Sequence, residues 1–287
     1  MKSKRALMAC YTVAAALALS AGCAGRQTLP IQVRLGACDW TLEKAGDPSV
    51  FSFARQIGLD GVQVSIEVKD GSLPLLQPGL QKAFLDSAER NGVGIASFAI
   101  GQLNEIPYKS DPAAERFLSQ AVDIAAAMNV QILLVPFFGK GDLVGDPAGA
   151  DTVVERLKKL APKAEKAGVV LALESWLSAK DHVKIMEAVG SPAVKVYYDV
   201  GNSDKAGHDI FSEILAMGPK IAQFHAKDYK DLYGKGSMDF KKVRASMEAI
   251  GYNGWFVMEG VHLPLGIEAS MKADLEYLRT VFPALVK

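Results

Sequence analysis

The chain has 287 residues, of which 49% are hydrophobic and 22% are charged. This composition is typical of one large globular domain rather than two small ones, and it argues against long disordered segments outside the ends. The 32 basic side chains balance 32 acidic ones, so no overall field favours nucleic acid or an anionic membrane surface, and any such contact would be local.

The amino-terminal segment differs from the rest of the chain. Residues 2–5 include three basic side chains, residues 6–19 form an apolar run, and the small residues 20–22 precede Cys23. A basic head, an apolar stretch too short to span a bilayer and a small-residue cleavage site are typical of an export signal. We therefore expect residues 1–22 to be a signal peptide of the bacterial lipoprotein type.

Processing at this site would make Cys23 the lipidated first residue, at the start of a tether over residues 23–32 that leads into one folded domain over residues 33–287. The protein is then expected in the periplasm or on the outer surface, with membrane contact only through the lipid. Ser20 stands where lipoprotein signals more commonly have Leu, and ordinary secretion with cleavage nearby is the alternative. Cys38 is the one other cysteine of the mature chain, so no disulfide is expected within the domain, and we assign Cys38 no catalysis.

After the tether, short β-branched runs alternate eight times with longer stretches of helical period. The expected strands cover residues 33–37, 61–66, 94–99, 130–135, 169–173, 194–198, 221–224 and 255–258. The expected helices cover residues 48–57, 80–91, 111–128, 151–167, 179–189, 209–217, 239–250 and 267–282. Eight such units predict an α/β fold, a single closed parallel (β/α)₈ or TIM barrel.

Four consecutive strands end in side chains that bind metals. These are Glu174, Asp199, His225 and Glu259. Residues at the carboxyl ends of barrel strands face the mouth, where chemistry takes place. A charged group at an apolar strand end is costly to bury alone, and a shared cation removes that cost for all four. Three carboxylates and one imidazole suit one divalent ion; we expect Mn²⁺ first, with Mg²⁺, Co²⁺ or Zn²⁺ as alternatives.

The competing interpretation is a set of separate salt bridges that cap the barrel, with Lys227 and Arg244 as the counter-charges. It requires four independent groups to occupy equivalent strand-end positions by coincidence, so the metal interpretation is preferred.

The same region resembles the xylose-isomerase-like family of sugar isomerases and epimerases, which includes hydroxypyruvate isomerase, ketose 3-epimerases and inosose dehydratase. The resemblance covers nearly all of the mature chain. The motifs that carry it are Leu173-Glu174, Tyr198-Asp199-Val200-Gly201-Asn202, His225-Ala226-Lys227-Asp228, Gly234-Lys235-Gly236 with Asp239-Phe240, and Gly251-Tyr252-Asn253-Gly254 running to Glu259. Each is weak alone, but their order and spacing are specific to the superfamily.

The resemblance implies that the four strand-end residues hold the metal and that Glu174 and Glu259 also act as acid and base. A divalent ion that chelates a carbonyl and an adjacent hydroxyl acidifies the neighbouring C–H and stabilises an enediolate. Return of the proton from the other face gives epimerisation, and return to the adjacent carbon gives aldose–ketose isomerisation. Ketose 3-epimerases often have a histidine where this chain has Asn202, which leaves that narrower activity open.

Several other residues near the strand ends are candidates for contact with a carbohydrate substrate. Glu67 would bind a hydroxyl or pair with Lys69. The aromatic side chains of Trp40, Phe138 and Trp176 would pack either on the C–H face of a sugar or against neighbouring loops. The full set of substrate-binding candidates is Trp40, Glu67, Phe138, Trp176, Asn202, Lys227 and His262. His182, near the start of a helix, is expected to be solvated rather than a ligand.

Three other functions compete with this interpretation. A lyase or dehydratase acting on a keto-sugar, keto-glycoside or cyclitol would use the same metal and expel a β-leaving group. A nuclease for abasic DNA on the same barrel needs about three zinc ions and several more histidines than the four present, so no nucleic-acid partner is expected. The non-enzymatic alternative is a tethered carbohydrate-binding lipoprotein. The sequence gives no indication of the oligomeric state.

Overall fold

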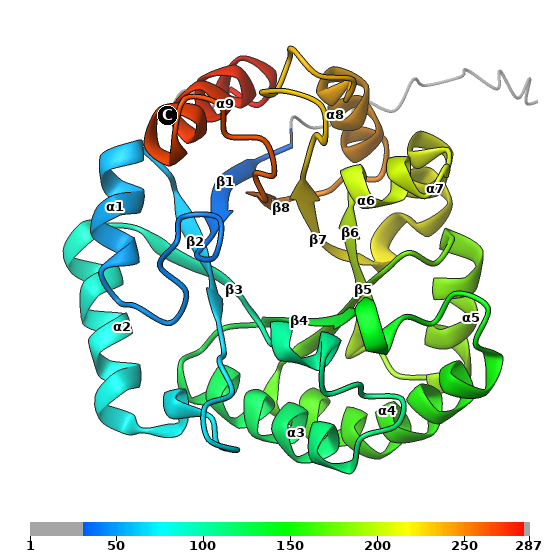
Figure 1. Ribbon diagram of the computed structural model, residues 1–287. Helices are drawn as coiled ribbons and strands as arrows, with labels where there is room; N and C mark the ends of the chain where they lie inside the picture. Colours follow the sequence, from blue (N-terminus) through cyan, green and yellow to red (C-terminus); the bar gives the residue numbers. More distant parts are fainter. Residues whose placement is uncertain (1–30, 284–287) are drawn as a thin grey trace, which may run out of the picture.

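Eight parallel strands close into a barrel in the computed structural model, which describes residues 31–283 (Figure 1). The strands are β1 (Val33–Cys38), β2 (Gly61–Ser65), β3 (Gly94–Ala99), β4 (Ile132–Phe137), β5 (Val170–Ser175), β6 (Val194–Asp199), β7 (Ile221–Ala226) and β8 (Gly254–Met258). They pair in chain order, and β8 pairs with β1, with Val33 opposite Gly254, so the sheet has no free edge. The predicted TIM barrel is confirmed.

A ring of helices covers the outside of the barrel (Figure 1). The helices are α1 (Val50–Ile57), α2 (Pro78–Asn91), α3 (Pro112–Ala127), α4 (Pro147–Ala167), α5 (Ala179–Val189), α6 (Val200–Lys205), α7 (Ile210–Met217), α8 (Phe240–Ala249) and α9 (Ile267–Val281). Short 3-10 turns are η1 (Pro74–Leu76), η2 (Gly101–Asn104), η3 (Gly139–Gly141) and η4 (Gly218–Lys220). The main apolar core lies between the helices and the outer face of the sheet.

The expected bounds lie within two residues of the observed ones except at the start of α4, and two of the differences affect the loop between β4 and α4. Helix α4 begins at Pro147 rather than at residue 151, because the Asp146 carboxylate caps it by accepting a hydrogen bond from the Gly149 amide. Strand β4 starts at Ile132 and extends to Phe137, about two residues later than expected. Both shifts shorten the loop between β4 and α4.

Helix α6 was not predicted. Asp199 is both the last residue of β6 and the amino-terminal cap of α6, where its Oδ1 accepts a hydrogen bond from the Asn202 amide at 2.8 Å. The strand therefore passes into a helix without a loop, and this fixes the Asp199 side chain at the mouth of the barrel.

The predicted signal peptide, Cys23 and nearly all of the tether lie outside the described residues. Within residues 31–283, no helix combines the length and the apolar character that crossing a membrane requires.

Candidate metal centre and substrate cavity

The four predicted metal-binding side chains meet at the carboxyl-terminal end of the barrel. Glu174 lies in β5, Asp199 ends β6, His225 lies in β7, and Glu259 follows β8. One candidate ligand atom from each of the four lies within 4.8 Å of the other three. His225 Nδ1 is 3.2 Å from Glu174 Oε1, 3.4 Å from Glu259 Oε2 and 3.7 Å from Asp199 Oδ2. We call these four side chains the metal-centre cluster.

Lys227 shares the carboxylates of this cluster. Its buried Nζ lies 2.6 Å from Glu259 Oε2 and 2.9 Å from Asp199 Oδ2. Arg244, the other proposed counter-charge, pairs instead with Glu248 at 2.7 Å. The salt-bridge interpretation is therefore right about Lys227 and wrong about Arg244.

The donor set fits a divalent cation. Three carboxylates against one ammonium leave a net negative charge in a site where three of the four cluster side chains are buried. Asp199 Oδ2 is buried and accepts no hydrogen bond, although it is ion-paired with Lys227. A buried carboxylate oxygen without a hydrogen bond is costly, and coordination to an ion would satisfy it. Among the described residues, this is the only such group of three or more potential ligands.

The electrostatics of the cluster follow from burial and mutual proximity. Burial raises the pKa of Asp199 to about 7; Glu259 and Glu174 act in the same direction, and Lys227 opposes them. Burial also acts to raise the pKa of Glu259, but Lys227 and His225 outweigh it and hold that pKa at about 2. Burial acts to lower the pKa of His225, and the three carboxylates reverse this to a net increase. Metal ligands bind as deprotonated carboxylates and neutral imidazole, so metal binding at this site is expected to release protons.

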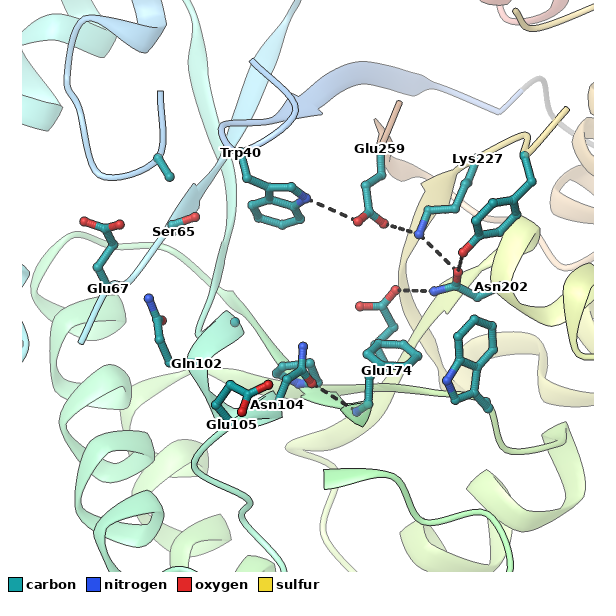
Figure 2. Close-up of a pocket in the computed structure, with 16 residues that line it drawn as sticks. Trp40, Ser65, Glu67, Gln102, Asn104, Glu105, Glu174, Asn202, Lys227 and Glu259 are labelled. Carbon is teal, nitrogen blue, oxygen red and sulfur yellow. Dashed lines mark hydrogen bonds and ion pairs between the residues drawn. The ribbon is translucent and has the colours of Figure 1, made fainter. Parts of the chain in front are cut away.

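A cavity of about 610 Å³ opens above the cluster, within the range of small-molecule sites. Six of the seven predicted substrate-binding residues line it: Trp40, Glu67, Phe138, Trp176, Asn202 and Lys227. Figure 2 labels Trp40, Glu67, Asn202 and Lys227. Their contact with substrate stays a prediction. His262 is the exception, because it and its neighbour Val261 are exposed on the loop after β8 and outside the cavity lining.

The aromatic residues surround the cavity in two ways. Phe138 and Trp176 pack edge to face, with ring centroids 5.2 Å apart. Trp40 donates a hydrogen bond from Nε1 to Glu259 Oε1 at 3.2 Å (Figure 2). Trp40 therefore positions a cluster carboxylate as well as lining the cavity.

Asn202 connects the cluster to its surroundings. Its side-chain amide donates to Glu174 Oε1 at 3.2 Å, and its Oδ1 accepts from Lys227 Nζ at 3.1 Å and from the Tyr229 hydroxyl at 2.6 Å (Figure 2). These contacts orient Glu174 and Lys227 without any proton transfer by the amide.

Some site residues were missed from the sequence. Four further residues line the cavity: Gln102 and Asn104 in η2, Glu105 directly after η2, and Tyr229 in the loop after β7. The long segment after β7 was recognised as a loop, but loops carry no hydrophobic period that predicts which side chains face inward.

The structure also places His182 and Glu67, two of the lesser candidates. His182 is 3% exposed rather than solvated; its Nδ1 lies 3.2 Å from the Ser178 carbonyl oxygen and its Nε2 lies 2.9 Å from Ser175 Oγ. That expectation was wrong, because α5 presents this residue to the end of β5. Glu67 pairs with Lys69 at 3.1 Å and also lines the cavity, so the salt bridge is present and contact with a substrate hydroxyl stays a prediction.

Comparison with known proteins agrees with this geometry. The model of the family described as "Xylose isomerase-like TIM barrel" matches residues 51–281. The chain belongs to this family. One relative, a 2-epi-5-epi-valiolone 7-phosphate 2-epimerase of Actinoplanes sp., is 28% identical over 197 residues, 68% of this chain and 72% of the relative. A putative L-ribulose-5-phosphate 3-epimerase of Escherichia coli is 25% identical over 236 residues, covering 74% and 82%.

Solved structures share the fold of this family member. The D-psicose 3-epimerase of Clostridium cellulolyticum, solved with D-tagatose, superposes with a TM-score of 0.75 at 18% identity, over 87% of this chain and 99% of that one. The named relatives are epimerases, so this protein is a sugar isomerase/epimerase-like enzyme.

Proposed function

We propose that the protein is a divalent-metal-dependent isomerase or epimerase of a sugar or sugar derivative. The observation that carries the proposal is the convergence of Glu174, Asp199, His225 and Glu259 at the floor of a cavity. The epimerase relatives support the reaction class. A purely carbohydrate-binding protein would not need three carboxylates around one imidazole at the base of its binding site.

The chain's own residues have distinct roles in this proposal. Glu174 and Glu259 reach the cavity from β5 and from the end of β8, and both line it (Figure 2). One takes a proton from the carbon next to the substrate carbonyl, and the other returns it from the opposite side. Asn202 and Trp40 hold these two carboxylates through hydrogen bonds.

The expected cofactor is one ion held by the metal-centre cluster. When bound, a divalent cation would polarise the carbonyl and acidify the adjacent C–H. Oxygen ligands with one imidazole suit Mn²⁺ first, and Mg²⁺, Co²⁺ or Zn²⁺ are the alternatives.

The test is exchange of substrate C–H with solvent deuterium. D-fructose, D-tagatose and L-ribulose are incubated with protein and Mn²⁺ in D₂O, the metal is removed with a chelator, and NMR locates the label and the product. Glu259→Gln and Glu174→Gln, checked for metal content, should each lower epimerisation by about 10²-fold or more. Glu155→Gln, on a surface ion pair with Lys158, is the matched control.

The product separates the related activities. An inverted carbon indicates an epimerase, a shifted carbonyl indicates an isomerase, and loss of a hydroxyl or glycosyl group indicates the lyase alternative. Unchanged turnover in Glu259→Gln would remove the proposed mechanism.

We further propose that the enzyme is exported and lipid-anchored through Cys23, on the basis of the pattern in residues 2–23. Labelling of cells with a radioactive fatty acid should mark the wild-type protein and not Cys23→Ser. Equal labelling of both would contradict the anchor.

A further inference from the structure

The side of the cavity away from Lys227 and Glu259 is formed by Glu67, Gln102, Asn104 and Glu105 (Figure 2). We call these four residues the far wall. They offer two carboxylates and two amides. Asn104 Oδ1 accepts a hydrogen bond from the Phe138 amide at 3.0 Å, which leaves the Asn104 NH₂ group to donate to a ligand. The far wall therefore suits groups that both donate and accept hydrogen bonds.

Cations are scarce in this cavity. Among the described residues that line it, Lys227 is the only basic one, and its ammonium is committed to Asp199 and Glu259. Two lysines near the far wall are exposed and paired with its carboxylates: Lys69 with Glu67 at 3.1 Å and Lys140 with Glu105 at 2.8 Å. A phosphate at the far wall would have to break these pairs and then lie beside the freed carboxylates. Lys205 lies over the Tyr229 and Trp176 rings, 4.2 and 5.9 Å from their centroids, and not at the far wall.

A phosphate monoester has a net charge of about −1.5 to −2 at neutral pH, and its oxygens act almost entirely as hydrogen-bond acceptors. Its usual partners are arginine, lysine and clustered backbone amides. Sugar hydroxyls, by contrast, donate to carboxylates and exchange hydrogen bonds with amides. We propose that the substrate is an uncharged polyhydroxy carbonyl compound without a phosphate group, with its hydroxyls bound by the far wall. This inference rests on the proposed function, and it sets the chain apart from the relatives named for phosphorylated substrates.

The test compares a matched pair, L-ribulose and L-ribulose 5-phosphate, on the Mn²⁺-loaded protein. Calorimetry measures binding, and deuterium exchange measures chemistry in parallel. The unphosphorylated sugar should bind at least about fivefold more tightly, the effect of one unit charge about 4 Å away in a water-filled site. Equal or tighter binding of the phosphate ester, or no binding of either sugar, would overturn the inference. Binding of L-ribulose without exchange would instead overturn only the proposed reaction.

The far wall itself is tested by charge removal. Glu67→Gln and Glu105→Gln should each reduce the preference for L-ribulose over its phosphate by a few fold, with Glu155→Gln on the distant surface pair unchanged. An unchanged preference in both far-wall variants would show that these carboxylates do not select the substrate.

A second inference concerns a polar layer inside the barrel, beneath the metal-centre cluster. Gln63, Ser97 and Gln223 are buried on β2, β3 and β7. The Nε2 atoms of both glutamines donate to Ser97 Oγ at 2.9 Å. Gln63 Oε1 lies 2.7 Å from His225 Nε2 and accepts from the Cys38 thiol at 3.3 Å.

These bonds fix the orientation of the Gln63 amide, with its nitrogen toward Ser97 and its oxygen toward His225. An oxygen acceptor at 2.7 Å requires the His225 proton on Nε2. Nδ1, which faces the three carboxylates, is then free to bind a metal. We infer that Gln63 is a positioning residue that sets the His225 tautomer for metal binding.

Gln63→Met removes the acceptor at similar volume, and Gln63→Glu restores it. Gln63→Met should weaken Mn²⁺ binding by about 10–100-fold in calorimetry, and Gln63→Glu should recover it. Gln223→Met is the matched control, because it disrupts the same buried layer without touching His225. Equal weakening in Gln63→Met and Gln223→Met, or none in Gln63→Met, would overturn the inference.

A measurement on the wild-type protein covers the case in which Gln63→Met does not fold. In the Zn²⁺-loaded protein, ¹⁵N NMR of the histidine rings should place the His225 proton on Nε2 and the metal on Nδ1. The reverse assignment would overturn the role of Gln63.

Discussion

Replacement of Lys227 by methionine tests how the charge of the metal-centre cluster is balanced. Without an ion, Lys227 is the one lysine within 3 Å of the Asp199 and Glu259 carboxylates in the described structure. Removing one partner from a buried ion pair typically costs about 3–5 kcal/mol. At about 2 °C per kcal/mol for a domain of this size, the metal-free variant should unfold about 6–10 °C lower than wild type.

The loss should be smaller with a divalent ion bound. With the ion bound, the ammonium faces a net charge of about −1. Without it the charge is about −2 to −3, because Asp199, with a pKa of about 7, is partly protonated, so the cost should fall by half or more, to about 1–2 kcal/mol. The thermodynamic cycle closes only if the variant binds the ion more tightly, by about 2 kcal/mol or about 30-fold.

The assay is thermal unfolding of wild type and Lys227→Met with chelator and with Mn²⁺, together with calorimetric titration of Mn²⁺. Lys184→Met, in an exposed pair with Asp181, is the control and should change stability by less than about 0.5 kcal/mol. Equal destabilisation with and without Mn²⁺, or weaker Mn²⁺ binding by the variant, would refute the reasoning.

Two further predictions concern the scaffold. Burial lowers the pKa of His182 to about 4, so as pH falls below about 6.5 the unfolded chain takes up this proton before the folded protein does. Between pH 7 and pH 5, the free energy of unfolding measured in urea should therefore fall by about 2 kcal/mol more for wild type than for His182→Gln. An equal fall in both proteins would contradict this prediction. A Cβ at Gly61 would collide with the Trp255 ring, so Gly61→Ala should lower the free energy of unfolding by about 1–3 kcal/mol. Gly79→Ala adds a Cβ in open space and should not destabilise the protein. Similar unfolding midpoints for the two variants would count against this packing.

The order of strands and helices was predictable because its signals are local. Gly58, Gly92 and Gly168 follow α1, α2 and α4 with left-handed backbone conformations, and each marked a helix end in the sequence. The metal-centre cluster was predictable for a topological reason: parallel strands of a closed barrel all bring their carboxyl ends to one rim.

The far wall and helix α6 were not predictable in the same way. Glu105 and Tyr229 lie in irregular segments, where side-chain direction depends on tertiary packing rather than on a repeat. Asp199 both ends β6 and caps the amino terminus of α6, and the sequence pattern indicated only the end of the strand. The polar layer did leave a signal, because Gln63, Ser97 and Gln223 interrupt strands that are otherwise mostly apolar, and an uncharged polar residue buried in a barrel strand needs a partner.

Anomalous diffraction from crystals soaked in Mn²⁺ is the most direct test of the metal centre. The geometry predicts one peak about 2.0–2.4 Å from an oxygen of each of the three carboxylates and from His225 Nδ1, with Lys227 Nζ displaced from that position. A peak elsewhere, or no peak while Lys227 keeps both of its carboxylate partners, would contradict the account.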